Sequence, residues 1–414
     1  MDSKLAIFGG PKAIQIEQPH YMWPVISKET ENAVLEQLHK TISIYDKSGI
    51  IDDVEKQLAN YYKRKYALLI NSGTMALYTM FVSAGLKKGD EVIVPVYNFP
   101  ASVTPLFFIG AIPILCDAES VTGNIDPKAI EKKITKKTKA ISVTHMWGIP
   151  CDMDEICEIA ERHGLMLFED FSHSHGAEFK GKLTGSFGNS AAASLQGQKI
   201  LTGGEGGVFL TDDKEMYDKA ILLGHYNKRA LQEIEKDSPL YKFGVTGMGF
   251  KLRVHPLAAA IIHEQFPHLN EWLRQKRIFA NLMNNFLKDM AGVETLDVPS
   301  YKKPSWYAYL FRYKSKELGG LEIEKFYKAL KAEGCSEADI PKSTCPLNAL
   351  PLFKNPNELF DGYKAPSPEQ FPMAEDFYNN TIKLPVWTDS KDKVFVDLYL
   401  KTIEKVVINY RELL

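Results

Sequence analysis

Two carboxylates and a lysine follow strand-like runs in the middle of the chain. Glu169 and Asp170 end the apolar run 165–168. Lys199 follows the small-residue run 191–195 and precedes the Gly-rich sequence GGEGG. A lysine that forms a Schiff base and a carboxylate that keeps a pyridine nitrogen protonated are the parts that a pyridoxal 5'-phosphate (PLP) site requires. The pair therefore favours PLP chemistry, although a surface lysine and a turn-capping Asp are the ordinary alternatives for each residue alone.

A turn that suits a phosphate group precedes these residues. Ser72, Gly73 and Thr74 lie between a strand-like run and a helix-like stretch. The N-terminus of a helix offers free N–H groups and a positive dipole end, and hydroxyl groups add donors. Ser194, five residues before Lys199, is a second candidate phosphate ligand. A plain helix N-cap is the alternative interpretation of the turn.

One aromatic residue and two histidines complete the set of candidates. Phe99 follows the strand-like run 91–95 and could stack on a flat ring, although a phenylalanine in this position is more often part of a core. His173 and His175 form an H-x-H pair, but no nearby residue supplies a third ligand with the spacing of a metal site, so we expect no metal. GGEGG is neither a dinucleotide fingerprint nor a P-loop, and no GxSxG sequence is present.

Short strand-like runs alternate with helix-like segments over the first two thirds of the chain. This alternation predicts βαβ units and a mostly parallel sheet with helices on both faces. Ligands of such sheets bind at the carboxyl ends of the strands, and each candidate residue follows a strand-like run. The expected strands are 66–70, 91–95, 112–116, 140–144, 165–168, 191–195 and 207–211, and the expected helices include 28–39, 52–62, 127–134 and 153–163.

A long helical pattern at 270–289 ends the alternation. The elements after it predict a smaller α+β domain, so we expect a large domain over residues 1–268 and a small domain over residues 269–414. A segment with seven prolines, 335–372, predicts a functional loop or an arm that reaches another subunit. The later elements are a strand-like run at 308–313 and helices near 322–333 and 391–412.

Composition excludes several classes of function. The 414 residues carry a net charge of −2 with both signs mixed, so neither a nucleic acid nor a membrane surface is an expected partner. No apolar run reaches the roughly 18 residues of a membrane span, and the first residues lack the pattern of a secretory signal. The five cysteines are scattered and form no CxxC pair, which indicates reduced thiols in a cytoplasmic protein.

Taken in order, these motifs resemble the DegT/DnrJ/EryC1/StrS family of sugar aminotransferases. The likeness covers nearly the whole chain, in sequences such as NSGTMAL, EVIVPVYNFPAS, FEDFSHSHGA, SLQGQKILTGGEGG and GFKLRVHPLAAA. The resemblance implies an α/β protein of PLP fold type I, which is aspartate-aminotransferase-like. In that fold a large domain with a mostly parallel mixed sheet is followed by a smaller α+β C-terminal domain.

The resemblance implies a role for each candidate residue. Lys199 matches the Schiff-base lysine, and Asp170 matches the partner of the pyridine nitrogen. His173 matches the residue near the hydroxyl of the PLP ring, and Phe99 matches the aromatic residue that stacks on that ring. The residues that match phosphate contacts are Gly73, Thr74 and Ser194.

One further position implies a second subunit. Where the family usually has Asn in a G-x-N-x-R sequence, this chain has Lys251. That Asn reaches the phosphate of the neighbouring subunit, so we expect Lys251 to do the same as a cation in a homodimer with shared active sites. The Pro-rich segment and the sequence GHYNKR around Tyr226 are expected substrate contacts.

The reaction follows from the same resemblance. EDFSHSHGA and SLQGQK are similar to the branch that aminates cyclitol ketones such as scyllo-inosose. The family also contains dehydratases that have lost the lysine, so Lys199 favours transfer of an amino group from glutamate or glutamine to a keto sugar or cyclitol, in ping-pong order. The alternatives are a PLP-dependent sugar dehydratase or epimerase and a non-catalytic regulatory protein on the same fold.

Overall fold

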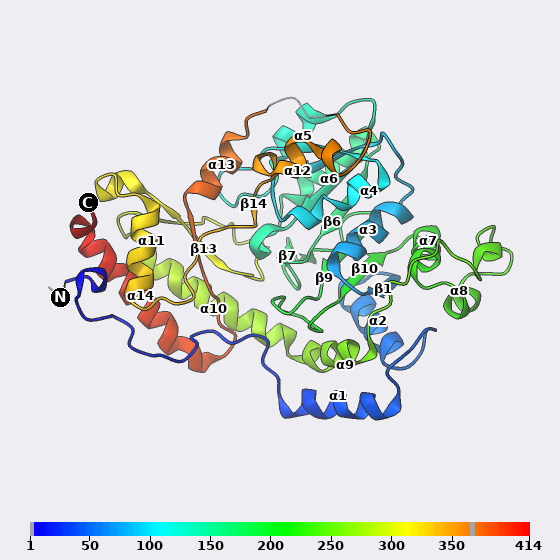
Figure 1. Cartoon of the computed structure of the whole chain (residues 1–414), viewed down its shortest axis with the longest axis horizontal. Coiled ribbons are helices and arrows are strands. Elements are labelled where there is room, and N and C mark those ends of the chain that lie inside the picture. The colour runs from blue at the N-terminus through cyan, green and yellow to red at the C-terminus, as the bar shows by residue number, and fades with distance from the viewer. Residues whose placement is uncertain (1–3, 365–368) are drawn as a thin grey trace.

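A seven-stranded sheet forms the centre of the larger of two lobes (Figure 1). The structure is a computed structural model that describes residues 4–364 and 369–414. β10 is antiparallel to both of its neighbours, and the other neighbouring strands are parallel. The mostly parallel mixed sheet expected from the sequence is therefore confirmed. In spatial order the strands are β1 (Tyr66–Ile70), β10 (Gly207–Thr211), β9 (Ser190–Ser194), β6 (Met166–Asp170), β5 (Thr138–Thr144), β2 (Glu91–Pro95) and β4 (Ile112–Cys116).

Helices cover both faces of this sheet because successive side chains of a strand point to opposite sides. In β2, Val92 and Val94 belong to the core on one face, and Ile93 belongs to the core on the other. The strands are therefore almost continuous apolar runs, as in other parallel sheets. The first face is covered by α3 (Gly73–Ser83), α4 (Pro105–Ile109) and α7 (Lys214–Gly224), and the second by α2 (Gly49–Tyr62), α5 (Pro127–Lys133), α6 (Met153–His163) and α9 (Pro256–Gln265).

The smaller lobe combines three long helices with a three-stranded antiparallel sheet. One hydrophobic cluster joins these helices to that sheet. This is the α+β organisation that the sequence predicts for the C-terminal part, and the division at residue 268 stays a prediction. The elements are α10 (Leu269–Leu287), β11 (Val293–Thr295), β13 (Tyr309–Tyr313), α11 (Ile323–Ala332), β15 (Thr381–Leu384) and α14 (Lys393–Ile408).

The N-terminal segment packs against the smaller lobe, although the sequence-based division assigns it to the large domain. Buried Glu333 accepts hydrogen bonds from the backbone N–H groups of Ala6, at 2.8 Å, and Ala13, at 2.9 Å. The ammonium of Lys405 lies 2.8 Å from the same carboxylate. Both termini therefore lie at the same end of the molecule (Figure 1). After this segment, α1 (Lys28–Lys40) lies against α9 of the larger lobe.

The Pro-rich segment is less irregular than its composition predicts. β14 (Cys345–Pro346) pairs with β3 (Tyr97–Asn98), and α12 (Pro351–Lys354) buries Phe353 in the core of the larger lobe. A two-residue strand has no periodicity to reveal it in a sequence. Residues 365–368, which include two of the seven prolines, lie outside the described residues. Further short elements are β7 (Glu178–Phe179), β8 (Lys182–Leu183), α8 (Lys228–Glu233), β12 (Lys302–Lys303) and α13 (Pro372–Asn379).

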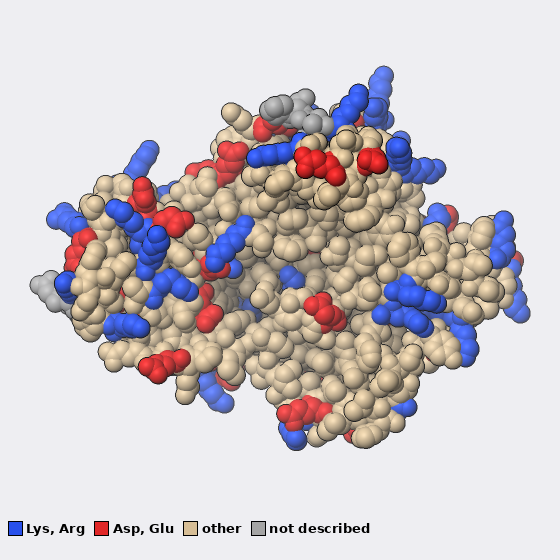
Figure 2. Space-filling view, in the orientation of Figure 1, with Lys and Arg blue, Asp and Glu red and all other residues tan. Residues whose placement is uncertain are grey.

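The surface mixes charges of both signs. Figure 2 shows Lys and Arg interspersed with Asp and Glu on the face in view, and a hollow between the two lobes. In the described part of the chain, no helix combines the length and the apolar character that a membrane crossing needs. All five cysteines are free thiols.

The buried carboxylate of Glu333 should be a strong determinant of stability. We expect Glu333→Gln to lower the free energy of unfolding by about 3 kcal/mol, because it removes one charge of a buried pair and leaves Lys405 unpaired. Urea denaturation measures this loss. The matched control is Glu31→Gln, whose exposed pair with Lys28 should change the free energy of unfolding far less. Equal losses for the two variants would contradict the assigned role of Glu333.

Candidate active site

The carboxyl ends of the parallel strands open into a cavity of about 330 Å³ between the two lobes. The larger lobe contributes the residues that follow β1, β6 and β9, and the smaller lobe contributes Tyr307 and Lys383. A larger cavity of about 690 Å³ lies at the edge strand β4, has a mostly apolar lining and contains none of the candidate residues. The candidates that line the first cavity are Gly73, Thr74, Phe99, Asp170, His173, Ser194 and Lys199.

Asp170 is held in one orientation at the end of β6. Only 2% of its surface is exposed. Its Oδ2 accepts a hydrogen bond from Ser102 Oγ at 2.6 Å, and its Oδ1 accepts one from the backbone N–H of Ser172 at 3.0 Å. A carboxylate fixed in this way can face a ring nitrogen without reorienting.

Glu169, its neighbour, points to the opposite side of the sheet and has a structural role. Its carboxylate lies 3.1 Å from His145 Nε2 and 3.8 Å from a guanidinium nitrogen of Arg64. Burial raises the pKa of Glu169, but His145, the charge of Arg64 and the backbone N–H of Gly188 together outweigh burial, so the pKa stays below its usual value. The backbone N–H groups that donate to it belong to Gly185, Phe187 and Gly188.

Lys199 is a buried amine that faces the same cavity as Asp170. Burial lowers the pKa of Lys199 to about 8, and the charge of Asp170 opposes part of this shift. In roughly a tenth of the molecules the amine of Lys199 is therefore uncharged at pH 7, a far larger fraction than for an exposed lysine. The backbone is fixed on both sides, because Lys199 N donates to Gln196 O at 2.8 Å and Trp23 Nε1 donates to Lys199 O at 2.8 Å. The chain thus offers a nucleophilic amine at a defined position.

The two histidines have different roles. The ring of His173 stacks on Tyr307, with centroids 4.0 Å apart. Burial and the charge of Lys199 hold the pKa of His173 well below its usual value, so the ring is neutral. Its buried Nδ1 has no hydrogen-bond partner among the described residues. His175 Nε2 instead lies 2.9 Å from Ser194 O, and burial lowers the pKa of His175 to about 4.

The H-x-H pair therefore does not act as a unit. One ring faces the cavity, whereas the other is held inside the large lobe between Tyr62 and the β9 backbone. Over residues 4–364 and 369–414, no group of three or more His, Cys, Asp or Glu side chains has the arrangement of a metal site.

The N-terminus of α3 has the features of an anion-binding corner. Ser72 Oγ accepts a hydrogen bond from Met75 N at 3.2 Å, so the N-cap interpretation of this turn is confirmed, and its phosphate contact stays a prediction. A Cβ on Gly73 would lie 2.5 Å from Ser194 Cβ and 2.7 Å from Ser194 Cα. Only glycine allows strand β9 to approach the helix this closely. The free N–H groups of the helix and the nearby hydroxyls then face the same part of the cavity.

Phe99 lies at the cavity and is not a core residue. It is 45% exposed. Buried Asn98 holds its backbone, because Asn98 Oδ1 accepts from Phe99 N at 2.8 Å while Asn98 Nδ2 donates to Thr144 at 3.1 Å. The ring is available for stacking on a flat ligand.

Several residues of the site were not identified from the sequence. Ser102 carries no signal beyond its place in a turn, and Tyr307, just before the strand-like run 308–313, looks like any other aromatic residue. Their positions depend on how the lobes meet. The main additions are Ser102, Trp147, Gln198, Tyr307 and Lys383. Thr344, which also lines the cavity, belongs to the Pro-rich segment that was expected to contact substrate.

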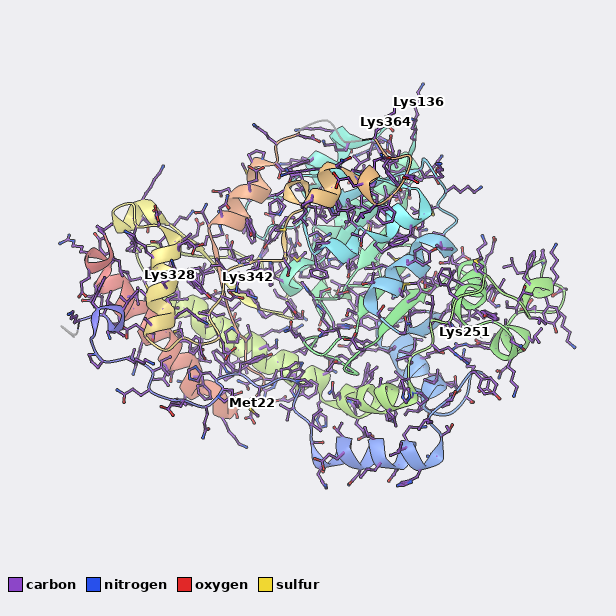
Figure 3. The ribbon with its side chains drawn as sticks, viewed as in Figure 1. Met22, Lys136, Lys251, Lys328, Lys342 and Lys364 are labelled. Atoms are coloured by element: carbon purple, nitrogen blue, oxygen red, sulfur yellow. The ribbon has the colours of Figure 1, made fainter. Side chains whose placement is uncertain are left out.

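Lys251 and Tyr226 do not line the cavity of their own chain. Lys251 Nζ lies 3.9 Å from the centroid of the Tyr226 ring, on the large lobe (Figure 3). The expected contact of Lys251 with the phosphate of a neighbouring subunit stays a prediction.

Comparison with known proteins identifies the family. The family model for DegT/DnrJ/EryC1/StrS aminotransferases matches residues 25–397. The chain belongs to this family. It is accordingly a PLP-dependent aminotransferase of fold type I.

Relatives and solved structures of this family cover most of the chain. The spore coat polysaccharide biosynthesis protein SpsC of Bacillus subtilis is 30% identical, over 94% of this chain and 96% of the relative. The L-glutamine:scyllo-inosose aminotransferase of Streptomyces griseus is 33% identical, over 84% of each. The structure of DesV from S. venezuelae is 26% identical, with a TM-score of 0.77 over 91% of this chain and 94% of that one.

The residues present fit PLP. The corner at Gly73 and Ser194 suits the phosphate, and Phe99 offers a face to the ring. Asp170 provides the fixed carboxylate, and Lys199 provides the amine. The unpartnered Nδ1 of His173 can donate to or accept from a ring substituent.

The contact between Gly73 and Ser194 should be essential for cofactor binding. We expect Gly73→Ala to weaken PLP binding at least about tenfold, because the added Cβ would displace the backbone of Ser194 and deform the anion corner. Spectroscopic titration of the apoprotein with PLP measures this change. The control is Gly197→Ala, whose Cβ would meet its nearest atom, Gly204 O, at 3.8 Å. Unchanged PLP affinity in Gly73→Ala would contradict the assignment.

Proposed function

We propose that this aminotransferase moves an amino group from glutamate or glutamine to a ketone of a sugar or cyclitol. The observation that carries the proposal is the buried amine of Lys199 in one cavity with the fixed carboxylate of Asp170. The substrate class is supported by relatives named for such reactions, among them the S. griseus inosose aminotransferase. The GDP-perosamine synthase of Escherichia coli O157:H7, 34% identical over 68% of this chain and 74% of its own length, also supports a sugar ketone.

The residues of the chain divide the work of the reaction. When bound, PLP supplies an electron sink that stabilises negative charge at the donor Cα. Asp170 favours a protonated pyridine nitrogen, which strengthens that sink. Lys199 Nζ takes the proton from the donor Cα in the first half of the reaction. In the second half it delivers a proton to the carbon that receives the amino group. Because a single cavity serves donor and acceptor, the donor product must leave before the ketone enters, which gives ping-pong kinetics.

Two alternatives remain as outcomes of the test. A sugar dehydratase, GDP-4-keto-6-deoxymannose-3-dehydratase, shares the fold with a TM-score of 0.79 at 24% identity, over 92% of this chain and all of that one. Lys199 favours transamination over that reaction. A relative from Geobacillus stearothermophilus, 30% identical over 87% of this chain and 89% of its own length, is named a pleiotropic regulatory protein.

The free thiols of all five cysteines support the expected cytoplasmic location.

We further propose that the protein acts as a homodimer with shared sites. The segment that carries Lys251 exposes four large apolar side chains, Phe243, Val245, Met248 and Phe250. Exposed apolar groups close together are typical of a surface that another chain covers. Lys251, which lies on this surface, would then reach the phosphate corner of the second subunit.

The first test follows the donor half of the reaction. We expect the absorbance of the PLP form to convert to that of the pyridoxamine form when L-glutamate or L-glutamine is added. A panel of keto sugars and cyclitol ketones should reverse the change. We expect Lys199→Ala to slow the conversion at least about 100-fold, because it removes the group that moves the proton. Failure of the unaltered protein to convert with either donor would contradict transamination and favour the dehydratase or regulatory alternatives.

The second test asks whether active sites are shared. Lys199→Ala and Lys251→Ala should each be nearly inactive alone, the second through weaker PLP binding. In mixed dimers one site would carry both substitutions and the other neither. Random mixing should therefore restore activity to about a quarter of that of the unaltered protein, because half of the dimers contain one intact site. A mixture no more active than the average of its two components would show that Lys251 acts within its own chain or not at all.

A further inference from the structure

A second lysine faces the cavity, from the smaller lobe. Lys383 lies on β15 and lines the cavity together with Thr344. Among the described residues of the lining, Lys199 and Lys383 are the two cationic side chains. The proposed function assigns Lys199 to the cofactor and assigns no role to Lys383.

The backbone and Asp339 fix the position of Lys383. The two residues exchange backbone hydrogen bonds of 2.8 Å and 2.9 Å, so they lie directly opposite each other. Lys383 Nζ lies 3.2 Å from one carboxylate oxygen of Asp339, and Lys342 Nζ lies 2.9 Å from the other. Two ammonium groups thus share one carboxylate, which leaves one positive charge in excess. Lys383 is the one of the two that lines the cavity, with its Nζ 5.8 Å from the centroid of the Trp147 ring.

This excess charge matches one of the two substrates of the proposed function and not the other. Glutamate and glutamine both carry a carboxylate on the carbon that bears the amine, whereas a sugar or cyclitol ketone has no charged group on its reacting carbon. A partly buried ammonium must keep an anionic partner in either case. Asp339 provides that partner when the ketone is present, and Lys342 keeps Asp339 paired when Lys383 turns to a ligand.

We propose that Lys383 binds the α-carboxylate of the amino donor and returns to Asp339 when the uncharged ketone takes its place. The inference rests on the proposed function, since it assigns a residue to donor recognition within that site. The α-carboxylate of the donor carries one negative charge, as Asp339 does, so it can take the place of Asp339 as the partner of Lys383. A phosphate dianion would add a second negative charge beside Asp339.

The test measures donor binding through the half-reaction of the PLP-loaded protein. We expect Lys383→Met to raise the half-saturating concentration of L-glutamate and L-glutamine at least about tenfold. With isoglutamine, the α-amide of glutamate, the same substitution should leave the half-saturating concentration unchanged, because isoglutamine lacks the carboxylate that Lys383 binds. Lys383→Arg should restore most of the affinity. The matched control is Lys328→Met, which removes an exposed ammonium of the smaller lobe outside the cavity lining (Figure 3) and should change the concentration less than about twofold.

Two outcomes of this assay overturn the inference. One is an equal loss in Lys383→Met with isoglutamine and glutamate, since it shows that Lys383 does not act on the α-carboxylate. The other is unchanged glutamate affinity in Lys383→Met.

A binding measurement separates failure of the inference from failure of the proposed function. Glutarate does not react, and its binding to the PLP-loaded protein can be followed by calorimetry. We expect its dissociation constant to rise at least about tenfold in Lys383→Met. If the unaltered protein converts no amino donor, the proposed function fails, and Lys383-dependent glutarate binding still supports a carboxylate site. Two results overturn the inference. One is a glutarate affinity that is the same with and without Lys383. The other is that Lys383→Met weakens the binding of inorganic phosphate and not that of glutarate.

Discussion

The direction of the strands is the constraint on which the site depends. β6 and β9 are parallel neighbours, so Asp170 at the end of one and Ser194 at the end of the other must lie at the same edge of the sheet. The reversed strand β10 begins at that edge, and its first residue, Gly207, lies against the turn at Ser72, where a Cβ would come within 2.4 Å of Ser72 O. A sheet with a different strand order would separate the amine, the carboxylate and the anion corner.

Burial at this edge gives the polar groups their chemical properties. Asp170 keeps two hydrogen-bond donors, so its carboxylate is fixed before a ligand arrives. For Lys199, burial lowers the pKa to about 8, although the charge of Asp170 opposes part of this shift. Glu169, one residue from Asp170, shows the contrast, because its carboxylate is satisfied by backbone N–H groups and charges inside the large lobe. Adjacent carboxylates thus have separate roles because a strand points them to opposite sides.

The smaller lobe contributes fewer residues to the cavity than the larger lobe, but they contact its central groups. Tyr307 stacks on His173 and lies 4.5 Å below the amine of Lys199, so one side chain contacts two residues of the other lobe. The N-terminal segment ties the lobes together, since Glu333 anchors its start and Trp23 donates to the backbone of Lys199. Changes in the packing between the lobes would therefore move groups at the reaction centre.

The sequence by itself determined the order and type of most elements, because their signals are local. Apolar runs bounded by turns located β1, β2, β4 and β10 at their observed bounds. The motifs around Asp170 and Lys199 were sufficient to indicate PLP, since the residue types carry the chemistry. Local patterns could not reveal β14, which has two residues and no periodicity, nor that the N-terminal segment packs on the smaller lobe.

What only the tertiary structure decided is which distant residues share the cavity. Ser102 binds Asp170, Tyr307 stacks on His173, and Lys383 joins the lining from β15. Their sequences look like an ordinary turn and ordinary strands. The physical reason is that a side chain's role depends on the group it faces across a strand edge or a lobe boundary, and that group is set by long-range packing, which local periodicity does not encode.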